Sequence, residues 1–389
     1  MSIHLIDTFD YALPEQLIAQ TAMEPRDASK LLFYHQGQIR NQIFRDLPDV
    51  LPKGAQLVFN NAKVIQARLF ARTQTNAKIE VFLLQPHGLE YSQALSATQH
   101  TQWQCMIGNK KKWKPEEQIL IEVGHAQLRL KQLAEQVVDF TWDGGISFGE
   151  LLELVGQLPL PPYIKHTPSK ADQSRYQTVF SKIEGSVAAP TAGLHFTENV
   201  LSDLDHKGFK RSELTLHVSA GTFLPVKVEQ YRDHTMHRES YEINIETLKA
   251  LMDSNCLVAV GTTATRVLES LYWAGIQLLN GVERPFEIPQ FVYELPYKVY
   301  SKEEVIQALI NDLTKRQQTT IYGNSAIMIV PGYTFKMVKG LVTNFHQPKS
   351  TLLLLISALI GDNWRQVYQH AIEHNYRFLS YGDASLLLP

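Results

Sequence analysis

Residues 186–223 read SVAAPTAGLHFTENVLSDLDHKGFKRSELTLHVSAGTF, and this stretch indicates the fold class of the whole chain. It begins with small residues and a proline, which exclude a regular helix. Thr197 is then placed to cap a short helix, and the segment that follows alternates apolar and polar residues as a strand does. His195 lies just before the helix and His217 lies in the strand, so we expect both histidines to belong to one site.

The composition is that of an ordinary globular protein. The chain has 389 residues, of which 44% are hydrophobic and 20% are charged, enough for about two or three domains. Its formal charge of −2 provides no global positive field for nucleic acid, although a local patch can still hold phosphates. Cys105 and Cys256 are too few for a disulfide framework or a cysteine-rich zinc site.

The sequence carries no recognisable export or membrane signal. Its first residues lack the basic and apolar regions of a signal peptide. The most apolar run, residues 352–360, is far shorter than the ~20 residues that a membrane span requires. We therefore expect a cytoplasmic protein without a membrane partner.

Residues 68–143 show a different pattern of apolar and polar residues from the rest of the chain. Short runs with period-two character are separated by glycine, proline, asparagine or polar tips, and helical periodicity is absent. These runs cover residues 78–84, 103–107, 118–123, 127–133 and 136–142. The pattern predicts a small antiparallel barrel or sandwich inserted in the chain.

One positive cluster lies in this insert, formed by Lys110, Lys111, Lys112 and Lys114 around Trp113. Such a cluster can hold a phosphate backbone while the aromatic ring stacks on a base. A solvated loop is the alternative interpretation, and it is the commoner one for a run of like charges.

Strands alternate with helices over residues 156–389, which predicts an α/β core. In such sheets ligands bind beyond the carboxyl ends of the strands. Four segments end strands with polar residues, and together with residues 193–195 we expect them to line one cleft. The four segments are residues 217–222, 261–263, 344–346 and 380–383.

The segment Gly261-Thr262-Thr263 follows a buried strand and precedes a helix. Unpaired N–H groups at a helix start bind anions, so this turn is a candidate anion site. It is not a nucleotide fingerprint, because neither GxGxxG nor GxxxxGK[ST] is present. Arg266, one turn later, is placed to pair with a ligand carboxylate, or else to form a surface salt bridge.

The histidines allow both functional and structural interpretations. His217 is a candidate catalytic group or an incidental residue of a half-exposed strand. His195 is a candidate base kept neutral by the helix dipole, or a satisfied loop histidine. His234 and His237, at HxxH spacing, suggest a metal only weakly, because strong zinc motifs use HExxH or add cysteines.

Long segments along nearly the whole chain carry a family resemblance. In order they are YALPEQLIAQ, EPRDASKLL, LVFNNAKVIQARLF, LPLPPYI, RYQTVF, GSVAAPTAGLHF, LTLHVSAGTF, DHTMHRE, VGTTATRVLES, PGYTFKMVKGLVTNFHQPKSTLLLLISALIG and YRFLSYGDA. With these segments the chain resembles the bacterial S-adenosylmethionine:tRNA ribosyltransferase-isomerases of queuosine biosynthesis. Ser219 departs from the pattern, since glycine is usual there, and it adds a side chain beside the expected cleft.

The resemblance implies a mixed α/β catalytic domain, residues 1–67 and 154–389, with a small antiparallel β-barrel domain inserted at residues 68–153. It implies transfer and isomerisation of the ribosyl group of S-adenosylmethionine onto 7-aminomethyl-7-deazaguanine, at the wobble position of a tRNA with a GUN-type anticodon. Epoxyqueuosine forms, and adenine and methionine are released. The reaction requires no metal and no cofactor beyond the consumed donor, and we expect a monomer.

Physical requirements of this reaction suggest roles for residues of the chain. Proton removal beside the sulfonium and loss of adenine call for groups with pKa values near neutrality, which histidines provide. We therefore predict His195 and His217 as catalytic residues, with His346 and Asp383 as further candidates behind them. The predicted substrate-binding residues are Thr191, Gly193, Ser219, Gly221, Thr222, Gly261, Thr262, Thr263, Arg266 and Asn344. Lys110, Lys111, Lys112 and Lys114 are the predicted tRNA contacts.

Two functions of other classes remain open at this point. A metal hydrolase would use His217, His234, His237 and His346, and it would lose activity with a chelator. A non-catalytic tRNA-binding protein would retain tRNA without forming product.

Overall fold

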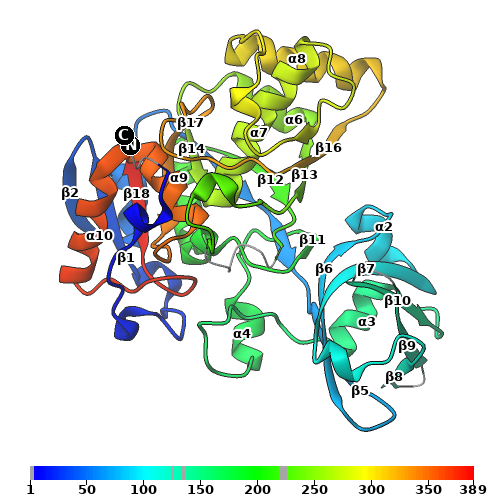
Figure 1. Cartoon of the computed structure of the whole chain (residues 1–389). Helices are drawn as coiled ribbons and strands as arrows, with labels where there is room; N and C mark the ends of the chain where they lie inside the picture. Colours follow the sequence, from blue (N-terminus) through cyan, green and yellow to red (C-terminus); the bar gives the residue numbers. More distant parts are fainter. Residues whose placement is uncertain (1–3, 125, 134–135, 220–225) are drawn as a thin grey trace.

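The structure is a computed structural model that describes residues 4–124, 126–133, 136–219 and 226–389. A ten-stranded mixed sheet flanked by helices forms the larger part, and a six-stranded antiparallel sheet forms a smaller lobe beside it (Figure 1). The predicted fold class, a mixed α/β part with a small inserted barrel, is confirmed.

Four parallel strands form the centre of the large sheet. They are β12 (Lys210–Leu216), β3 (Gln56–Asn60), β14 (Leu257–Val260) and β17 (Val338–Asn344), adjacent in that order. Because parallel neighbours run in the same direction, their carboxyl ends meet at one edge of the sheet.

Shorter pairings extend the sheet on both sides. On one side β13 (Glu239–Asn244) pairs antiparallel with β12, followed by β16 (Thr320–Ser325) and β15 (Glu287–Ile288). On the other side lie β18 (Ala384–Leu388), β1 (Lys30–His35) and β2 (Gln38–Ile43). Glu239 begins β13, so it lies at the same edge as the carboxyl end of β12.

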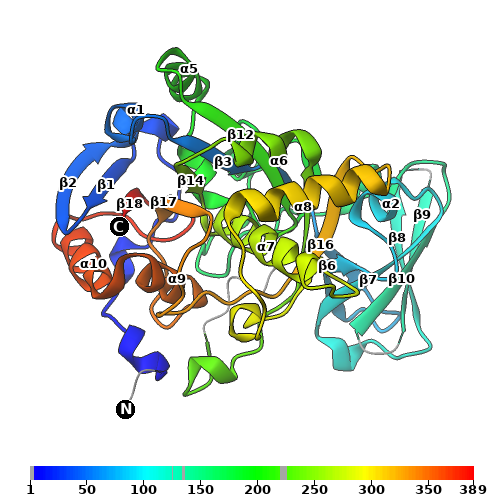
Figure 2. The ribbon, with the colours of Figure 1, turned by 90° about the horizontal axis from the view of Figure 1, so that it is seen from above.

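Helices cover both faces of the large sheet, because successive strand residues point to opposite faces. Val58, Ala259 and Leu341 pack with α7 (Thr262–Leu279) and α9 (Thr351–Ile360). Leu57, Val258 and Val342 pack on the other face with α1 (Leu47–Val50) and α5 (Glu198–His206). Figure 2 shows these two helical layers on opposite sides of the strands. The remaining helices of this part are α4 (Lys170–Arg175), α6 (Ile245–Met252), α8 (Lys302–Lys315) and α10 (Trp364–Glu373).

The predicted helix and strand signals of the opening stretch are confirmed. The Thr197 hydroxyl accepts a hydrogen bond from the N–H of Val200 at 3.3 Å and so caps α5. The strand after it, β12, differs from the half-exposed strand that we considered, because Thr215, Leu216 and His217, which directly follows the strand, are all buried. The residues here alternate in polarity but not in burial, since the Thr215 hydroxyl donates to Asn61 Oδ1 and Tyr91 of the insert covers His217.

The insert forms a nearly closed antiparallel barrel. Its strands are β5 (Arg68–Arg72), β6 (Lys78–Pro86), β7 (His100–Gly108), β10 (Val137–Trp142), β9 (Ala126–Gln132) and β8 (Gln118–Val123), in this spatial order. The edge strands β5 and β8 are in contact. Trp103, Phe140 and Phe148 fill the interior. The boundaries 68 and 153 of a separate domain stay a prediction.

Two helices accompany this barrel. α3 (Phe148–Val155) begins at a capping box of Ser147 and Glu150, and Gly156 follows its last residue. The sequence pattern missed α2 (Tyr91–Ser96), because six residues are too few to show helical periodicity. A short two-stranded sheet of β4 (Ala62–Val64) and β11 (Ile183–Ser186) connects the insert to the large sheet. Within the described residues, no helix has the length and apolar character needed to cross a membrane.

A buried carboxylate joins α7 to the beginning of β17. Glu269 is fully buried and accepts the Tyr333 hydroxyl at 2.6 Å and three backbone N–H groups. These belong to Lys336, Met337 and Val338, at 2.9, 3.0 and 2.9 Å. Glu269 therefore fixes the segment 336–338 against α7, the helix that begins at the carboxyl ends of the strands.

We predict that Glu269→Ala lowers the free energy of unfolding by about 3 kcal/mol or more, because it leaves several buried donors without an acceptor. Urea denaturation of the purified variant measures this loss. The exposed Glu283 provides a matched control, and Glu283→Ala should stay within about 0.5 kcal/mol of the unsubstituted protein. Equal stabilities of the two variants would contradict the assigned role of Glu269.

Candidate functional site

A pocket lies where the carboxyl ends of the central strands meet. It has about 750 Å³ of empty space, counting the part open to solvent, and we call it the strand-end pocket. Its lining includes residues 188–192, Val218, residues 261–263, residues 343–347 and Ser380. Each of the four predicted strand-end segments contributes at least one residue to this lining, whereas residues 193–195, which we also expected there, do not.

The start of α7 forms one wall of the strand-end pocket. Gly261 has a φ of 92°, in the left-handed region that favours glycine, and Thr262 begins the helix. The first N–H groups of a helix have no intrahelical acceptor, and they carry the positive end of the helix dipole. This wall is therefore suited to a carboxylate or another anion.

Two buried oxygen atoms in the lining lack a hydrogen-bond partner among the described residues. They are Thr263 Oγ1 and Asn344 Oδ1. Asn344 is 2% exposed, and its amide nitrogen donates to the Leu379 carbonyl at 3.0 Å. Because burial without a hydrogen bond is costly, these oxygens are suited to donors that a ligand brings. Thr191 also lines the pocket, as predicted.

His346 is the histidine that lines the strand-end pocket. Its Nε2 lies 3.0 Å from the Thr343 hydroxyl. Burial lowers the pKa of His346 to about 3. The imidazole is therefore neutral at pH 7, although its pKa lies well below the near-neutral value that we expected of a catalytic base.

His195 lies behind Asn344 rather than in the strand-end pocket. Its Nε2 is 3.3 Å from Asn344 Nδ2, and its Nδ1 is 2.7 Å from the Ser29 hydroxyl. Since the amide nitrogen can only donate, Nε2 accepts and Nδ1–H donates to Ser29. The ring stacks on Phe44 and lines a smaller pocket with Arg26 and Tyr381.

The pKa of His195 is lowered to about 3, first by burial and then by the charge of Arg377. We expected a neutral ring because of the helix dipole, so the charge state agrees with the prediction while the main cause is burial. His195 holds Asn344 in place, and its catalytic role stays a prediction.

His217 lies at the contact between the large sheet and the insert. Its ring stacks on Tyr91 of α2 with centroids 4.1 Å apart and planes 9° apart. Its Nε2 lies 2.9 Å from Glu242 Oε1, and Nδ1 is buried without a partner among the described residues. A Cβ on Gly185 would lie 2.7 Å from Nδ1, so glycine is needed there. This environment is that of a packed residue, and a catalytic role of His217 also stays a prediction.

Asp383 and Gly193 make local structural contacts. The Asp383 carboxylate accepts the N–H of Lys30 at 3.0 Å and the N–H of Arg377 at 2.7 Å, although burial raises its pKa. A Cβ on Gly193 would lie 2.6 Å from the Phe180 ring, so Gly193 makes room for an aromatic side chain. Neither Asp383 nor Gly193 is among the described residues that line the strand-end pocket.

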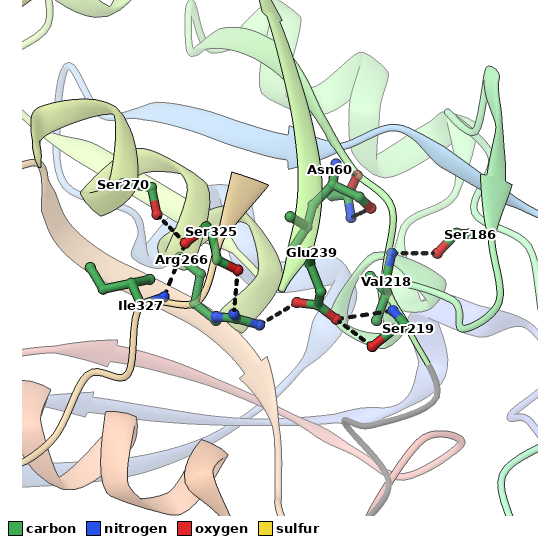
Figure 3. A network of polar contacts seen from close by, with 10 residues as sticks. Asn60, Ser186, Val218, Ser219, Glu239, Arg266, Ser270, Ser325 and Ile327 are labelled. Atoms are coloured by element: carbon green, nitrogen blue, oxygen red, sulfur yellow. Dashed lines mark hydrogen bonds and ion pairs between the residues drawn. The ribbon is translucent and has the colours of Figure 1, made fainter. Parts of the chain in front are cut away.

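Arg266 forms a buried ion pair rather than the surface salt bridge that we considered. Arg266 Nη1 donates to Glu239 Oε2, and the two side chains are 6% and 1% exposed. Glu239 Oε1 also accepts the N–H of Ser219 at 3.0 Å and its hydroxyl at 3.4 Å (Figure 3). The Arg266 charge is therefore already paired, and the predicted ligand carboxylate would have to compete with Glu239.

This ion pair lines a second pocket, of about 530 Å³ counting open solvent, which we call the ion-pair pocket. Its lining includes Ser219, His234, His237 and apolar residues of three segments. Leu352 lines both pockets, so the start of α9 separates them. Ser219 therefore belongs to this neighbouring pocket and not to the strand-end pocket.

His234 and His237 do not gather with the other histidines. Burial lowers the pKa of His234, with a smaller effect from His237. Among the described residues, no group of three His, Cys, Asp or Glu side chains is placed to hold a metal ion.

The lysine cluster lies in the connection between β7 and β8. Lys110–Lys112 form one turn of 3-10 helix, and Lys110, Lys111, Lys112 and Lys114 are exposed. Trp113 is 2% exposed and donates its Nε1–H to the Glu117 carbonyl at 2.8 Å. The idea that Trp113 stacks on a base is wrong, because the ring belongs to the barrel core. The lysines stay predicted tRNA contacts.

Gly221 and Thr222 lie outside the described residues. Sequence reasoning missed Glu239, Thr343 and Tyr91, each of which contacts a predicted residue. Glu239 had one available signal, a charged residue at the start of a strand-like segment. Thr343 and Tyr91 had none, since their contacts come from the tertiary fold.

Comparison with known proteins gives one consistent family. Residues 6–387 match the family described as Queuosine biosynthesis protein. A protein of Treponema denticola, called S-adenosylmethionine:tRNA ribosyltransferase-isomerase, is 36% identical over 405 residues, covering 99% of this chain and 100% of its own. One of the same name from Desulfitobacterium hafniense is 39% identical over 394 residues, covering 98% and 99%.

A solved structure of S-adenosylmethionine tRNA ribosyltransferase from Thermotoga maritima is 28% identical. The match covers 98% of this chain and 99% of that one. Its TM-score is 0.47, and this likeness adds nothing to the description of the fold.

The buried neutral state of His195 predicts a loss of stability in acid. The unfolded chain binds a proton below the ordinary pKa of about 6.5, whereas folded His195 binds one only near pH 3. The unfolded state therefore holds more protons between these values, and stability falls as the pH falls through 6.5. Between pH 7.5 and 5.5, this histidine alone should cost about 1.4 kcal/mol.

The measurement is urea denaturation of the unsubstituted protein and of His195→Asn at both pH values. We expect the variant to lose less stability than the unsubstituted protein, by about that amount. His206, an exposed histidine of α5, provides the control, because His206→Asn should keep the full acid-dependent loss. An undiminished loss in His195→Asn would mean that the ring is charged or exposed in the folded protein.

Proposed function

The chain belongs to the family of queuosine biosynthesis proteins, and we propose that it transfers and isomerises a ribosyl group from S-adenosylmethionine to a tRNA base. The resemblance predicted from the sequence is thereby confirmed. Like its relatives, the chain is an enzyme, an S-adenosylmethionine:tRNA ribosyltransferase-isomerase. The strand-end pocket is the observation that supports this activity best, since it combines an anion-binding helix start, unpartnered acceptors and a neutral imidazole.

The finer parts of the reaction are part of the proposal. The acceptor is 7-aminomethyl-7-deazaguanine at the wobble position of a tRNA with a GUN-type anticodon. The products are epoxyqueuosine, adenine and methionine. S-Adenosylmethionine is consumed as the ribosyl donor without a further cofactor, and the protein works as a cytoplasmic monomer.

The donor's amino-acid part matches one end of the strand-end pocket. Its carboxylate would lie at the start of α7, where the N–H groups of residues 262 and 263 and the helix dipole favour negative charge. Its ammonium would donate to Asn344 Oδ1, which has no partner among the described residues. Arg266 is not needed for this contact, because Glu239 already pairs with it.

His346 is suited to remove the proton. The sulfonium acidifies the hydrogens on the adjacent ribose carbon, and a nearby neutral base can take one of them. The His346 ring lines the pocket, and burial keeps the ring uncharged. Thr343 holds the other nitrogen and so fixes the orientation of the ring. We propose His346 as the base and His195 as a positioning residue that acts through Asn344.

The activity is tested by incubating the protein with S-adenosylmethionine and tRNA that carries 7-aminomethyl-7-deazaguanine. Mass spectrometry of the nucleosides should show epoxyqueuosine, and free adenine and methionine should appear in equal amounts. The matched control is the same tRNA with guanine at that position, which lacks the nucleophile. A protein that retains the tRNA but releases neither adenine nor product would be a binding protein instead.

His346→Gln should lower kcat by a factor on the order of 100, with the KM for S-adenosylmethionine changed only a few-fold. Glutamine can keep the hydrogen bond to Thr343 but cannot serve as a base, so the loss would report proton transfer. His206→Gln on the exposed side of α5 should leave kcat unchanged. Steady-state kinetics with near-normal turnover in His346→Gln would exclude the proposed base.

A further inference from the structure

We infer that the ion-pair pocket binds a purine-type base, a step that rests on the proposed function. The reaction involves two such bases, the adenine of the donor and the deazaguanine of the tRNA. The strand-end pocket provides the polar groups for the donor's amino-acid end. The ion-pair pocket lies at the same sheet edge and shares Leu352 with it, so one ligand system can extend across both.

The charges at the ion-pair pocket favour an uncharged ligand. Arg266 and Glu239 neutralise each other, and both are almost completely buried. A phosphate attracted by Arg266 would also be repelled by Glu239, and a cation attracted by Glu239 would also be repelled by Arg266, so neither gains a net attraction from the pair. A neutral group that offers donors and acceptors along one edge meets neither obstacle.

Among the described residues, the ion pair retains hydrogen-bonding capacity that no partner uses. Glu239 accepts one bond from Arg266 and two from Ser219, and an ionised carboxylate has about four acceptor sites. Arg266 Nε is buried without a partner among the described residues, and Nη2 is a long 3.5 Å from the Ser325 carbonyl. Figure 3 shows that Ser325 is itself held by Ser270 and Ile327. Acceptor capacity on Glu239 and one donor on Arg266 therefore have no partner in the part of the chain that the structure describes.

The walls of the pocket suit the flat faces of a ring. Ile327, Met328 and Ile329 line it from the segment after β16, and Leu355 lines it from α9. Met236 lines it from the segment before β13. Thioethers and branched apolar side chains contact aromatic faces favourably. Enzymes that act on a nucleic-acid base hold the extruded base in this way, with polar groups at its edge and apolar groups on its faces.

The test replaces a side chain that lines the ion-pair pocket with a larger one and leaves Arg266 and Glu239 unchanged. In Met236→Trp the indole would occupy the space of the base, and Met236 is only partly buried. Val299→Trp, at a position 55% exposed, is the control for adding a large ring. Both variants are compared with the unsubstituted protein by equilibrium binding, which is independent of turnover. Failure of this inference is therefore distinguishable from failure of the proposed reaction.

Two ligands distinguish the two sources of the base. If the deazaguanine occupies the pocket, Met236→Trp weakens tRNA binding at least tenfold, down to the affinity of the same tRNA with an abasic wobble position. The Kd for S-adenosylmethionine then stays within twofold. If the adenine occupies the pocket, the Kd for S-adenosylmethionine rises at least tenfold, and tRNA binding stays within twofold. Unchanged binding of both ligands would overturn the inference.

Glu239→Gln gives a second, independent reading, because it keeps the shape of the side chain and removes its charge. We expect it to weaken the same ligand about tenfold. Thermal melting of each variant shows whether it is folded, since breaking a buried ion pair is strongly destabilising. A folded form of either variant that binds both ligands normally would overturn the inference.

Discussion

The parallel pairing of β12, β3, β14 and β17 is the constraint on which the candidate site depends. Residues 60, 216, 260 and 344 end these strands at one edge, so each following loop begins there. The Asn60 side chain strengthens this register, since its Oδ1 accepts the N–H of Leu216 and its Nδ2 donates to the Leu216 carbonyl. A slip by one residue would turn the polar residues after each strand away from the pocket.

Low polarity around the strand ends determines the charge states of the groups there. His346 and His195 are neutral because burial makes a charged imidazole costly. The charges that are buried nearby are compensated, as in the pair of Arg266 and Glu239. In such surroundings an added charge, such as a sulfonium, acts more strongly on its neighbours than it would in water. The groups around the pocket therefore carry no uncompensated charge until a charged ligand binds.

Local sequence signals predicted the strands, the helix caps and the gathering of strand ends, because each depends on residues close together in the chain. The cap at Thr197 is an example, since this residue begins α5 in the structure. The roles of individual side chains could not be predicted in this way. The partner of His195 at Ser29 is 166 residues distant, and that of Arg266 at Glu239 is 27 residues distant. The alternating pattern predicted on which face of the strand His217 would lie. It could not predict that Tyr91 of the insert would pack against that face.

The stacking of His217 on Tyr91 also means that the buried state of a residue in one lobe depends on the other lobe. His217 directly follows the central strand β12, and Tyr91 of α2 in the insert covers its ring. Gly185 leaves the space in which the two rings meet. Excising the insert and rejoining the chain would expose this face and leave Glu242 as the remaining described polar partner of His217. The two lobes therefore depend on each other, because each contributes one ring to the same buried stack.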